Sequence, residues 1–250
     1  MARFLAPLLL SLAFLTSACG TPSHVYRPAD DVEKLSGDKV ATQMVDALGG
    51  MAAYDRVKQI EFSFVFTVFG KELTRRFHAW DKTRGFAYIR FFHDEEHYEA
   101  WVRLADKTGV VKVEGERLSD EEAKLILKEA YGMWVNDTYW FIAPYKVFDP
   151  GVDRAYVDGE LRISFNKDIG LTPEDVYLFK FDDDNRPQDW TFYLQGEHSA
   201  KVEYKNPVVL NDVTLYLKRV TAFGEVNFES LRVLTDKTDD RRFTPLLENP

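Results

Sequence analysis

Apolar and polar side chains alternate with a period of two along most of this chain, which is the pattern of half-buried β-strands. In the segment 61–68, three phenylalanines and Val68 fall on one face, whereas Glu61, Ser63 and Thr67 fall on the other. Turn-forming residues recur about every ten positions, a spacing that is typical of an antiparallel meander. The expected strands are 61–68, 72–80, 86–92, 97–104, 110–113, 161–165, 177–181, 190–194, 201–204, 213–217 and 226–233.

Two stretches change to the helical period. The segment 40–48 carries apolar residues at helical spacing and is followed by two glycines that end it. Ser119 begins a second helix, and Glu122 three positions later completes a capping box with it. We expect this helix to run toward the segment 134–151, which is rich in aromatic residues and ends in prolines.

Together these elements predict an α+β fold. We expect a single strongly curved antiparallel β-sheet, a half-open barrel, with helices packed on the concave side. The chain has 19 Phe, 12 Tyr and 5 Trp but one cysteine, so packing rather than an intramolecular disulfide must hold the fold. The net charge of −9 argues against a nucleic-acid partner, because phosphate binding depends on basic residues. We predict a monomer without a cofactor.

The N-terminal residues 1–18 have the features of a secretory signal. Arg3 is the only charge, an apolar run follows, and small residues precede Cys19. The run is too short for a bilayer span, which takes ~20 apolar residues. The segment 15–19, Leu-Thr-Ser-Ala-Cys, resembles the lipobox of bacterial lipoproteins, although Thr16 stands where that family usually has Leu. An ordinary signal peptide with a chance cysteine is the alternative.

This resemblance implies cleavage before Cys19 and a lipid on that cysteine, which would attach the protein to a membrane. Residues 19–37 would then form a lipidated N-terminus and polar tether, and residues 38–250 a single domain. Gly20 follows the cysteine, where some bacteria use Asp to retain lipoproteins in the inner membrane. The resemblance therefore implies an outer-membrane anchor with the domain facing the periplasm, and the inner membrane or the cell surface are the alternatives.

Several short motifs in the body of the chain resemble those of a family of uncharacterised bacterial outer-membrane lipoproteins. The motifs are Leu48-Gly49-Gly50, His78-Ala79-Trp80-Asp81, the block 134–140, the segment 144–152 and Gly170-Leu171-Thr172-Pro173. The layout is also similar to the fold of the lipoprotein carriers LolA and LolB. That similarity implies a helical lid over an apolar cavity that holds acyl chains. Function is then expected to be the binding of a lipid or another hydrophobic ligand, without catalysis.

Seven residues are candidates for binding such a ligand. His78 and Trp80 share one face of a strand, and two candidates lie together on the next strand; if both faces are concave, they form a basic and aromatic lining. Such a lining suits an anionic head group above an apolar tail. The candidates are His78, Trp80, Tyr88, Arg90, Trp134, Tyr139 and Trp140. The alternatives are that His78 is an interior histidine, that Arg90 pairs with a carboxylate, and that the aromatic block plugs the sheet in a structural or interaction module.

One motif resembles a metal-dependent hydrolase site. His93, Glu96 and His97 fit the pattern His-x-x-Glu-His, which needs both histidines on one face of a helix. Here the motif lies between two expected strands, so a polar hairpin tip, with at most adventitious metal binding, is favoured. The acidic segment 182–185 is likewise expected to be a hairpin turn, because it lacks the ligand spacing of a calcium loop. We therefore predict no catalytic residue and no structural metal.

Overall fold

The computed structural model describes residues 24–166, 175–194 and 198–248. The predicted signal peptide, Cys19 and the motif 170–173 lie outside these residues. In the described part of the chain, no helix combines the length and the apolar character needed to cross a membrane.

Thirteen antiparallel strands form one open sheet with the order β6-β5-β4-β3-β2-β1-β13-β12-β11-β10-β9-β8-β7. Each half of the sheet is a meander, and the pairing of β1 with β13 joins the halves. The strands are β1 (Gln59–Val68), β2 (Lys71–Asp81), β3 (Phe86–His93), β4 (Glu96–Arg103), β5 (Gly109–Val113), β6 (Glu116–Arg117), β7 (Val152–Val157), β8 (Glu160–Phe165), β9 (Val176–Phe181), β10 (Pro187–Leu194), β11 (His198–Leu210), β12 (Val213–Val220) and β13 (Gly224–Leu234). The eleven predicted strands are confirmed, and β6 and β7 are additional.

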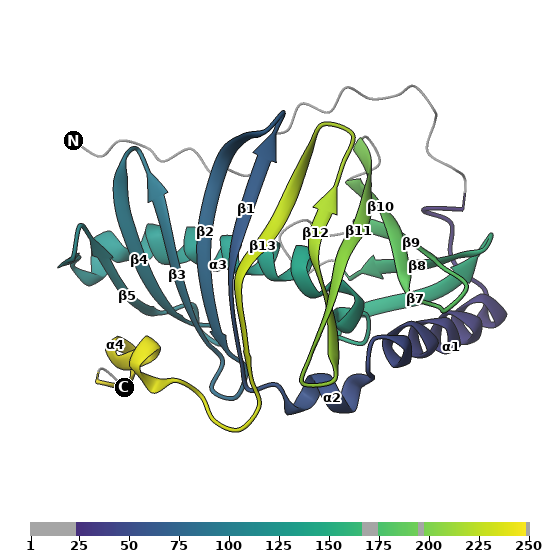
Figure 1. Ribbon diagram of the computed structural model, residues 1–250, viewed down its shortest axis with the longest axis horizontal. Helices are drawn as coiled ribbons and strands as arrows, with labels where there is room; N and C mark the ends of the chain where they lie inside the picture. Colours follow the sequence, from purple (N-terminus) through teal and green to yellow (C-terminus); the bar gives the residue numbers. More distant parts are fainter. Residues whose placement is uncertain (1–23, 167–174, 195–197, 249–250) are drawn as a thin grey trace.

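The connection between the two meanders explains the position of the long helix α3 (Asp120–Ile142). It follows β6 at one edge of the sheet and precedes β7 at the other edge, so the chain has to cross the whole sheet. A flat sheet of this size would be about 58 Å wide at ~4.8 Å per strand, whereas a helix of 23 residues is about 35 Å long. The sheet bends around the helix, which places α3 in its concave side (Figure 1). The predicted curved sheet with a helix on the concave side is confirmed.

The capping box of α3 is present as predicted, with Ser119 as N-cap and Glu122 as its partner. The helix continues through the aromatic block to Ile142 and then tightens into the 3-10 turn η1 (Ala143–Lys146). In the block, Asn136, Asp137 and Thr138 interrupt the aromatic residues, so it has no regular helical period of hydrophobicity and its pattern alone does not predict a helix.

Helix α1 (Asp31–Ala47) begins earlier than predicted, and this corrects the expected tether. Asp30 caps it, and Glu33 completes a second capping box. Gly37 lies inside the helix, where a Cβ atom would come within 2.6 Å of the Cα atom of Ala155 on β7. Glycine is needed at this close approach of two backbones. Because 31–37 is helical and Val25 is 1% exposed, the prediction of a tether reaching to residue 37 is wrong.

Two faces of the sheet are covered by different parts of the chain. The main core lies on the concave side, where side chains from the C-terminal half of α1, from α2 (Met51–Arg56) and from α3 join the phenylalanines of β1 in one cluster. On the convex side, Phe243 and Leu246 are buried against Tyr88 and Trp101. They belong to the segment 235–248, here called the C-terminal strap, which contains the turn η2 (Asp240–Phe243) and α4 (Thr244–Leu247). Figure 1 shows α3 and α4 on opposite faces of the sheet. The short helix α4 therefore departs from the prediction that the helices pack on the concave side.

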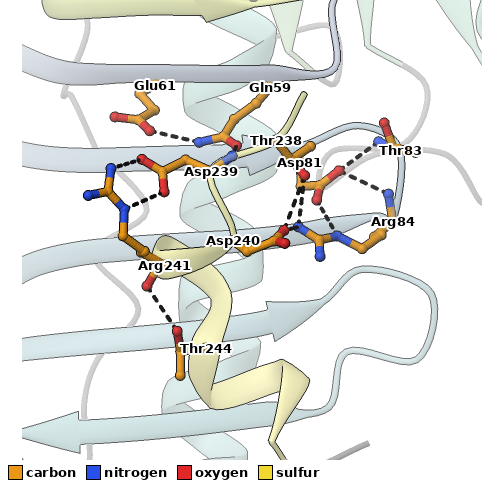
Figure 2. A network of polar contacts seen from close by, with 10 residues as sticks. All are labelled: Gln59, Glu61, Asp81, Thr83, Arg84, Thr238, Asp239, Asp240, Arg241 and Thr244. Carbon is orange, nitrogen blue, oxygen red and sulfur yellow. Dashed lines mark hydrogen bonds and ion pairs between the residues drawn. The ribbon is translucent and has the colours of Figure 1, made fainter. Parts of the chain in front are cut away.

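The strap is held by the polar network in Figure 2. The backbone N–H of Asp239 donates to Gln59 Oε1 over 2.7 Å, and Gln59 Nε2 donates to Glu61 Oε1 over 2.7 Å. Arg84 pairs with both Asp81 and Asp240. Glu61 is therefore 4% exposed, although the alternation in β1 placed it on a polar outer face.

Candidate functional site

Five of the seven candidate residues gather on the concave side, between α3 and the sheet: His78, Trp80, Trp134, Tyr139 and Trp140. The other two do not join them. In the register of β2 and β3, His78 is opposite Ile89 and Ala79 is opposite Tyr88, so Tyr88 lies on the convex face.

Arg90 is two positions after Tyr88 on β3, so it also lies on the convex face, opposite Phe77 of β2. Its guanidinium carbon lies 5.4 Å from the centre of the Phe77 ring. Tyr88 packs against Trp101, and its hydroxyl donates to Glu99 over 2.6 Å. The expected lining that combines Tyr88 and Arg90 with His78 is therefore wrong, because the register places them on opposite sides of the sheet.

A buried ionic cluster connects α3 to the sheet; we call Arg76, His78 and Asp137 the latch. Arg76 Nε and Nη2 donate to the two oxygens of Asp137, each over 2.7 Å, and His78 Nε2 lies 2.7 Å from Asp137 Oδ2. The three residues are 6%, 0% and 0% exposed. Arg76 and His78 can reach the same carboxylate because residues two apart on β2 share a face.

The charges in the latch set the protonation of Asp137. Burial by itself raises the pKa of this carboxyl, but the Arg76 guanidinium and the hydrogen bond with His78 outweigh burial and hold the pKa below its ordinary value. An ionised carboxylate only accepts, so His78 Nε2 carries the proton. The Nδ1 atom of His78 is buried and has no hydrogen-bond partner within the described ranges. The prediction of an interior histidine is consistent with this position, but one ring nitrogen remains unsatisfied.

Aromatic side chains fill the space between the C-terminal half of α3 and the sheet. Tyr139 lies 5.7 Å from Trp190 and 5.3 Å from Tyr177, measured between ring centres. Trp140 makes an edge contact with Trp190, and Phe141 packs at 4.7 Å from Phe62. In this structure the aromatic block fills the space between α3 and the sheet, which was the structural alternative to ligand binding for these residues.

The buried side-chain donors without a partner in the part of the chain that the structure describes include Trp134 Nε1, Tyr139 OH and Trp190 Nε1, which lie beside α3. Burial also raises the pKa of Tyr139 well above its ordinary value, so its hydroxyl keeps its proton. An unsatisfied buried donor costs about 1–3 kcal/mol and is uncommon in folded proteins. Three such donors beside one helix mark this interface as incomplete.

The middle turn of α3 differs from its two ends. Ala130 and Asp137 are fully buried, but every residue of 131–135 is half-buried. Successive residues point about 100° apart around a helix, so these five cover all its sides. Each side of the middle turn is therefore partly exposed, including the side of Trp134, whose ring meets Trp80 at 5.4 Å although its Nε1 atom is buried.

Sequence reasoning missed Arg219 on β12, which holds the C-terminal end of α3. Its Nη2 donates to the carbonyl oxygen of Phe141 over 2.9 Å, and its guanidinium carbon lies 3.9 Å from the centre of the Tyr204 ring. Arg219 is fully buried, and burial lowers its pKa to about 10. Arg219 falls on the same face of β12 as the buried residues Val213 and Leu215. A basic residue at a position where the alternation predicts an apolar one was the signal in the sequence that could have identified it.

The possible hydrolase motif forms a hairpin. His93 ends β3, Glu96 begins β4, and Asp94 and Glu95 have positive φ in the turn between them. His97 is opposite Phe92, so His93 and His97 lie on opposite faces. Across the described residues, no group of three or more His, Cys, Asp or Glu side chains could hold a metal ion.

The acidic segment after β9 also forms the predicted turn, in which Asp182 Oδ1 accepts from the backbone N–H groups of Asp184 and Arg186. This side chain is thus used to close the hairpin.

Comparisons with known proteins give one kind of match. No protein-family model matches this chain, and no curated protein is similar to it in sequence. Among solved structures, it is similar to a LolA superfamily protein from Nitrosomonas europaea, with 9% sequence identity and a TM-score of 0.46. The match covers 83% of this chain and 97% of that protein.

Proposed function

We propose that this protein binds a lipid or another hydrophobic ligand on the concave face of its sheet, with α3 as a movable cover, and that it catalyses no reaction. The observation that carries the proposal is the middle turn of α3, in which all five residues of 131–135 are half-buried although Tyr131, Met133 and Trp134 pack on the core of β3, β4 and β5. A helix that simply completed a core would bury its inner side. Here the entry for a ligand lies beside 131–135, between α3 and the side chains of β2.

The buried donors give the ligand site a polar component. Trp134 Nε1, Tyr139 OH and Trp190 Nε1 can each donate to an ester or amide carbonyl oxygen, which would remove the cost of leaving them unsatisfied. The surrounding aromatic rings supply apolar area for an acyl chain, at roughly 25 cal/mol per Å² buried. An amphiphile with a carbonyl near its apolar tail combines both requirements.

Gly132 lies in the half-buried turn and lowers the helical stability there by about 1 kcal/mol relative to alanine. Arg219 holds the C-terminal end of α3 through the carbonyl of Phe141. Opening would therefore involve the N-terminal half of α3 and the latch, while the C-terminal end stays attached.

The membrane anchor belongs to the same proposal. Residues 1–19 resemble a lipoprotein signal, and a lipid on Cys19 would hold the domain at the outer membrane, facing the periplasm. A permanently attached binding domain would act on ligands at that surface. Labelling with an alkyne fatty acid tests the anchor, since Cys19→Ala should abolish incorporation.

The binding proposal is tested with the chain from residue 19 onward carrying Cys19→Ala, stripped of bound lipid. Titration with palmitate and with phosphatidylglycerol vesicles should produce a saturable change in tryptophan fluorescence. Trp134→Leu should weaken binding by at least about tenfold, the loss of roughly 1.4 kcal/mol. Trp101→Leu is the matched control, because Trp101 lies on the convex side under the strap.

The second candidate function is an envelope structural or interaction module with a filled core. The tight ring contacts of Tyr139, Trp140 and Phe141 favour it. An absence of saturable binding by either lipid would contradict the binding proposal and leave this module as the better account.

A further inference from the structure

A second site lies on the other face of the sheet, away from α3. A hollow of about 1050 Å³ is bounded by the N-terminal segment 25–29, by α1 and by the strands β7, β8 and β9. Arg162 and Ser164 in its wall alternate with the core residues Leu161 and Ile163, which places the hollow on the convex side.

The hollow is positively charged in an acidic protein. The chain carries a net charge of −9, but the wall of the hollow contains Arg27, Lys34, Arg154 and Arg162 against Asp38 and Asp153. Arg27 pairs with Glu33, and Arg154 Nε lies 2.6 Å from Asp38 Oδ1. No carboxylate within the described ranges forms an ion pair with Lys34 or Arg162, although Glu33, the partner of Arg27, also acts on Arg162 at longer range.

Arg162 has unused hydrogen-bonding capacity that faces this space. It is 6% exposed, and its Nη1 donates to the carbonyl oxygens of His24 and Arg27, each over 2.7 Å. A guanidinium has five N–H donors, and those on Nε and Nη2 have no acceptor in the part of the chain that the structure describes. The two carbonyl contacts tie the N-terminal segment to β8, but they leave the fork of the guanidinium available.

We infer that this hollow binds a carboxylate or phosphate group, with the guanidinium of Arg162 as the buried contact and the ammonium of Lys34 at the entrance. An arginine fork matches the geometry of such oxyanions, and two cations without an ion-pair partner in the described residues favour them electrostatically. The apolar side chains of Val25 and Val176 stand in the same wall. A free anion and the anionic head of an amphiphile share this chemistry.

Lys34→Glu is the first test, with Lys39→Glu as its matched control. Both lysines are exposed on α1, and only Lys34 lines the hollow. Calorimetric titration of the chain from residue 19 onward, with Cys19→Ala, uses inorganic phosphate in one arm and decyl phosphate in the other. We expect Lys34→Glu to weaken binding at least about tenfold and Lys39→Glu to leave it nearly unchanged. Binding in both arms indicates a site for free anions, and binding of decyl phosphate alone indicates an amphiphile.

Arg162→Gln gives a second measurement, and thermal unfolding reports whether the N-terminal segment remains attached. If it folds with a melting temperature close to the parent, phosphate or decyl phosphate binding should be lost. Failure of both anions to bind the parent protein, or an equal effect of the two lysine variants, would overturn the inference. Trp134→Leu should not affect this site and Lys34→Glu should not affect palmitate binding, so failure here is distinguishable from failure of the concave-face proposal.

Discussion

The two faces of the sheet are covered in different ways. On the convex side, the C-terminal strap is short but its polar groups are engaged: Asp239 is bonded to Gln59, and Trp101 Nε1 donates to the carbonyl oxygen of Arg242 over 2.8 Å. On the concave side, α3 is long and aromatic, and its ionic connection to the sheet is the latch.

The unsatisfied atoms are divided unequally between these covers. In the chain as described, buried polar side-chain atoms without a partner include Trp134 Nε1 and Tyr139 OH on α3, and none in the strap. When all polar groups of a covering segment are hydrogen-bonded, a ligand offers them no new bonds. When buried donors lack a partner, a ligand that accepts from them removes the free-energy cost of leaving them unsatisfied. This difference supports the proposal that α3 moves while the strap stays in place.

The largest expected effect comes from removing the charge of the latch. Asp137→Asn leaves the buried guanidinium of Arg76 without its counter-charge, which should lower the free energy of unfolding by about 3–5 kcal/mol. Urea unfolding measures this change. Asp120→Asn is the matched control on the same helix, because Asp120 is exposed and its substitution should alter stability by no more than about 0.5 kcal/mol. Similar losses in the two variants would mean that the latch does not hold α3.

Acid should destabilise the attachment of the concave cover more than that of the convex one. The folded-state pKa of Asp137 lies below the unfolded value near 3.8, with burial opposed by Arg76 and His78. Its contribution is therefore complete above about pH 4 and is lost as the pH falls through the depressed folded value. The hydrogen bond with Arg241 outweighs burial and also holds the pKa of Asp239 below its ordinary value. However, the side chain of Arg241 is 88% exposed, so solvent screens this pair.

Unfolding measured between pH 2 and pH 6 can separate the two carboxyls. Asp137→Asn should flatten the acid dependence of stability more than Asp239→Asn does. An equal flattening would show that burial of the latch adds nothing to the electrostatic stabilisation, and it would remove one difference between the covers.

The strands were predictable from the sequence because their cause is local. Phe62, Phe64 and Phe66 alternate with polar residues, and that alternation is enough to define β1. The signal for the start of α1 was also present, since Asp30 and Glu33 form the same kind of capping box as Ser119 and Glu122. It was missed because the segment is polar and contains Gly37, whose role depends on contact with a distant strand.

The site was harder to predict because it depends on long-range pairing. Arg76 and Asp137 are 61 positions apart, and neither has a local pattern that indicates the other. The side of the sheet on which Tyr88 lies follows from the register with β2, and the burial of Glu61 follows from the strap, whose Arg242 lies 3.6 Å from Glu61 Oε2. Local alternation identifies two faces of a strand, but only the rest of the chain decides what covers each face.

The smallest expected effects compare one tyrosine under each cover. Tyr139→Phe removes a buried hydroxyl without a partner and should raise the free energy of unfolding by up to about 1 kcal/mol. Tyr88→Phe removes a hydroxyl that donates to Glu99 and should lower it by about 1 kcal/mol. Both are measured by urea unfolding. If the Tyr139 hydroxyl serves a ligand carbonyl, Tyr139→Phe should also weaken palmitate binding while the protein becomes more stable, and Tyr88→Phe should leave binding unchanged. Destabilisation by both substitutions would mean that the two interfaces are equally complete, and it would contradict the movable role of α3.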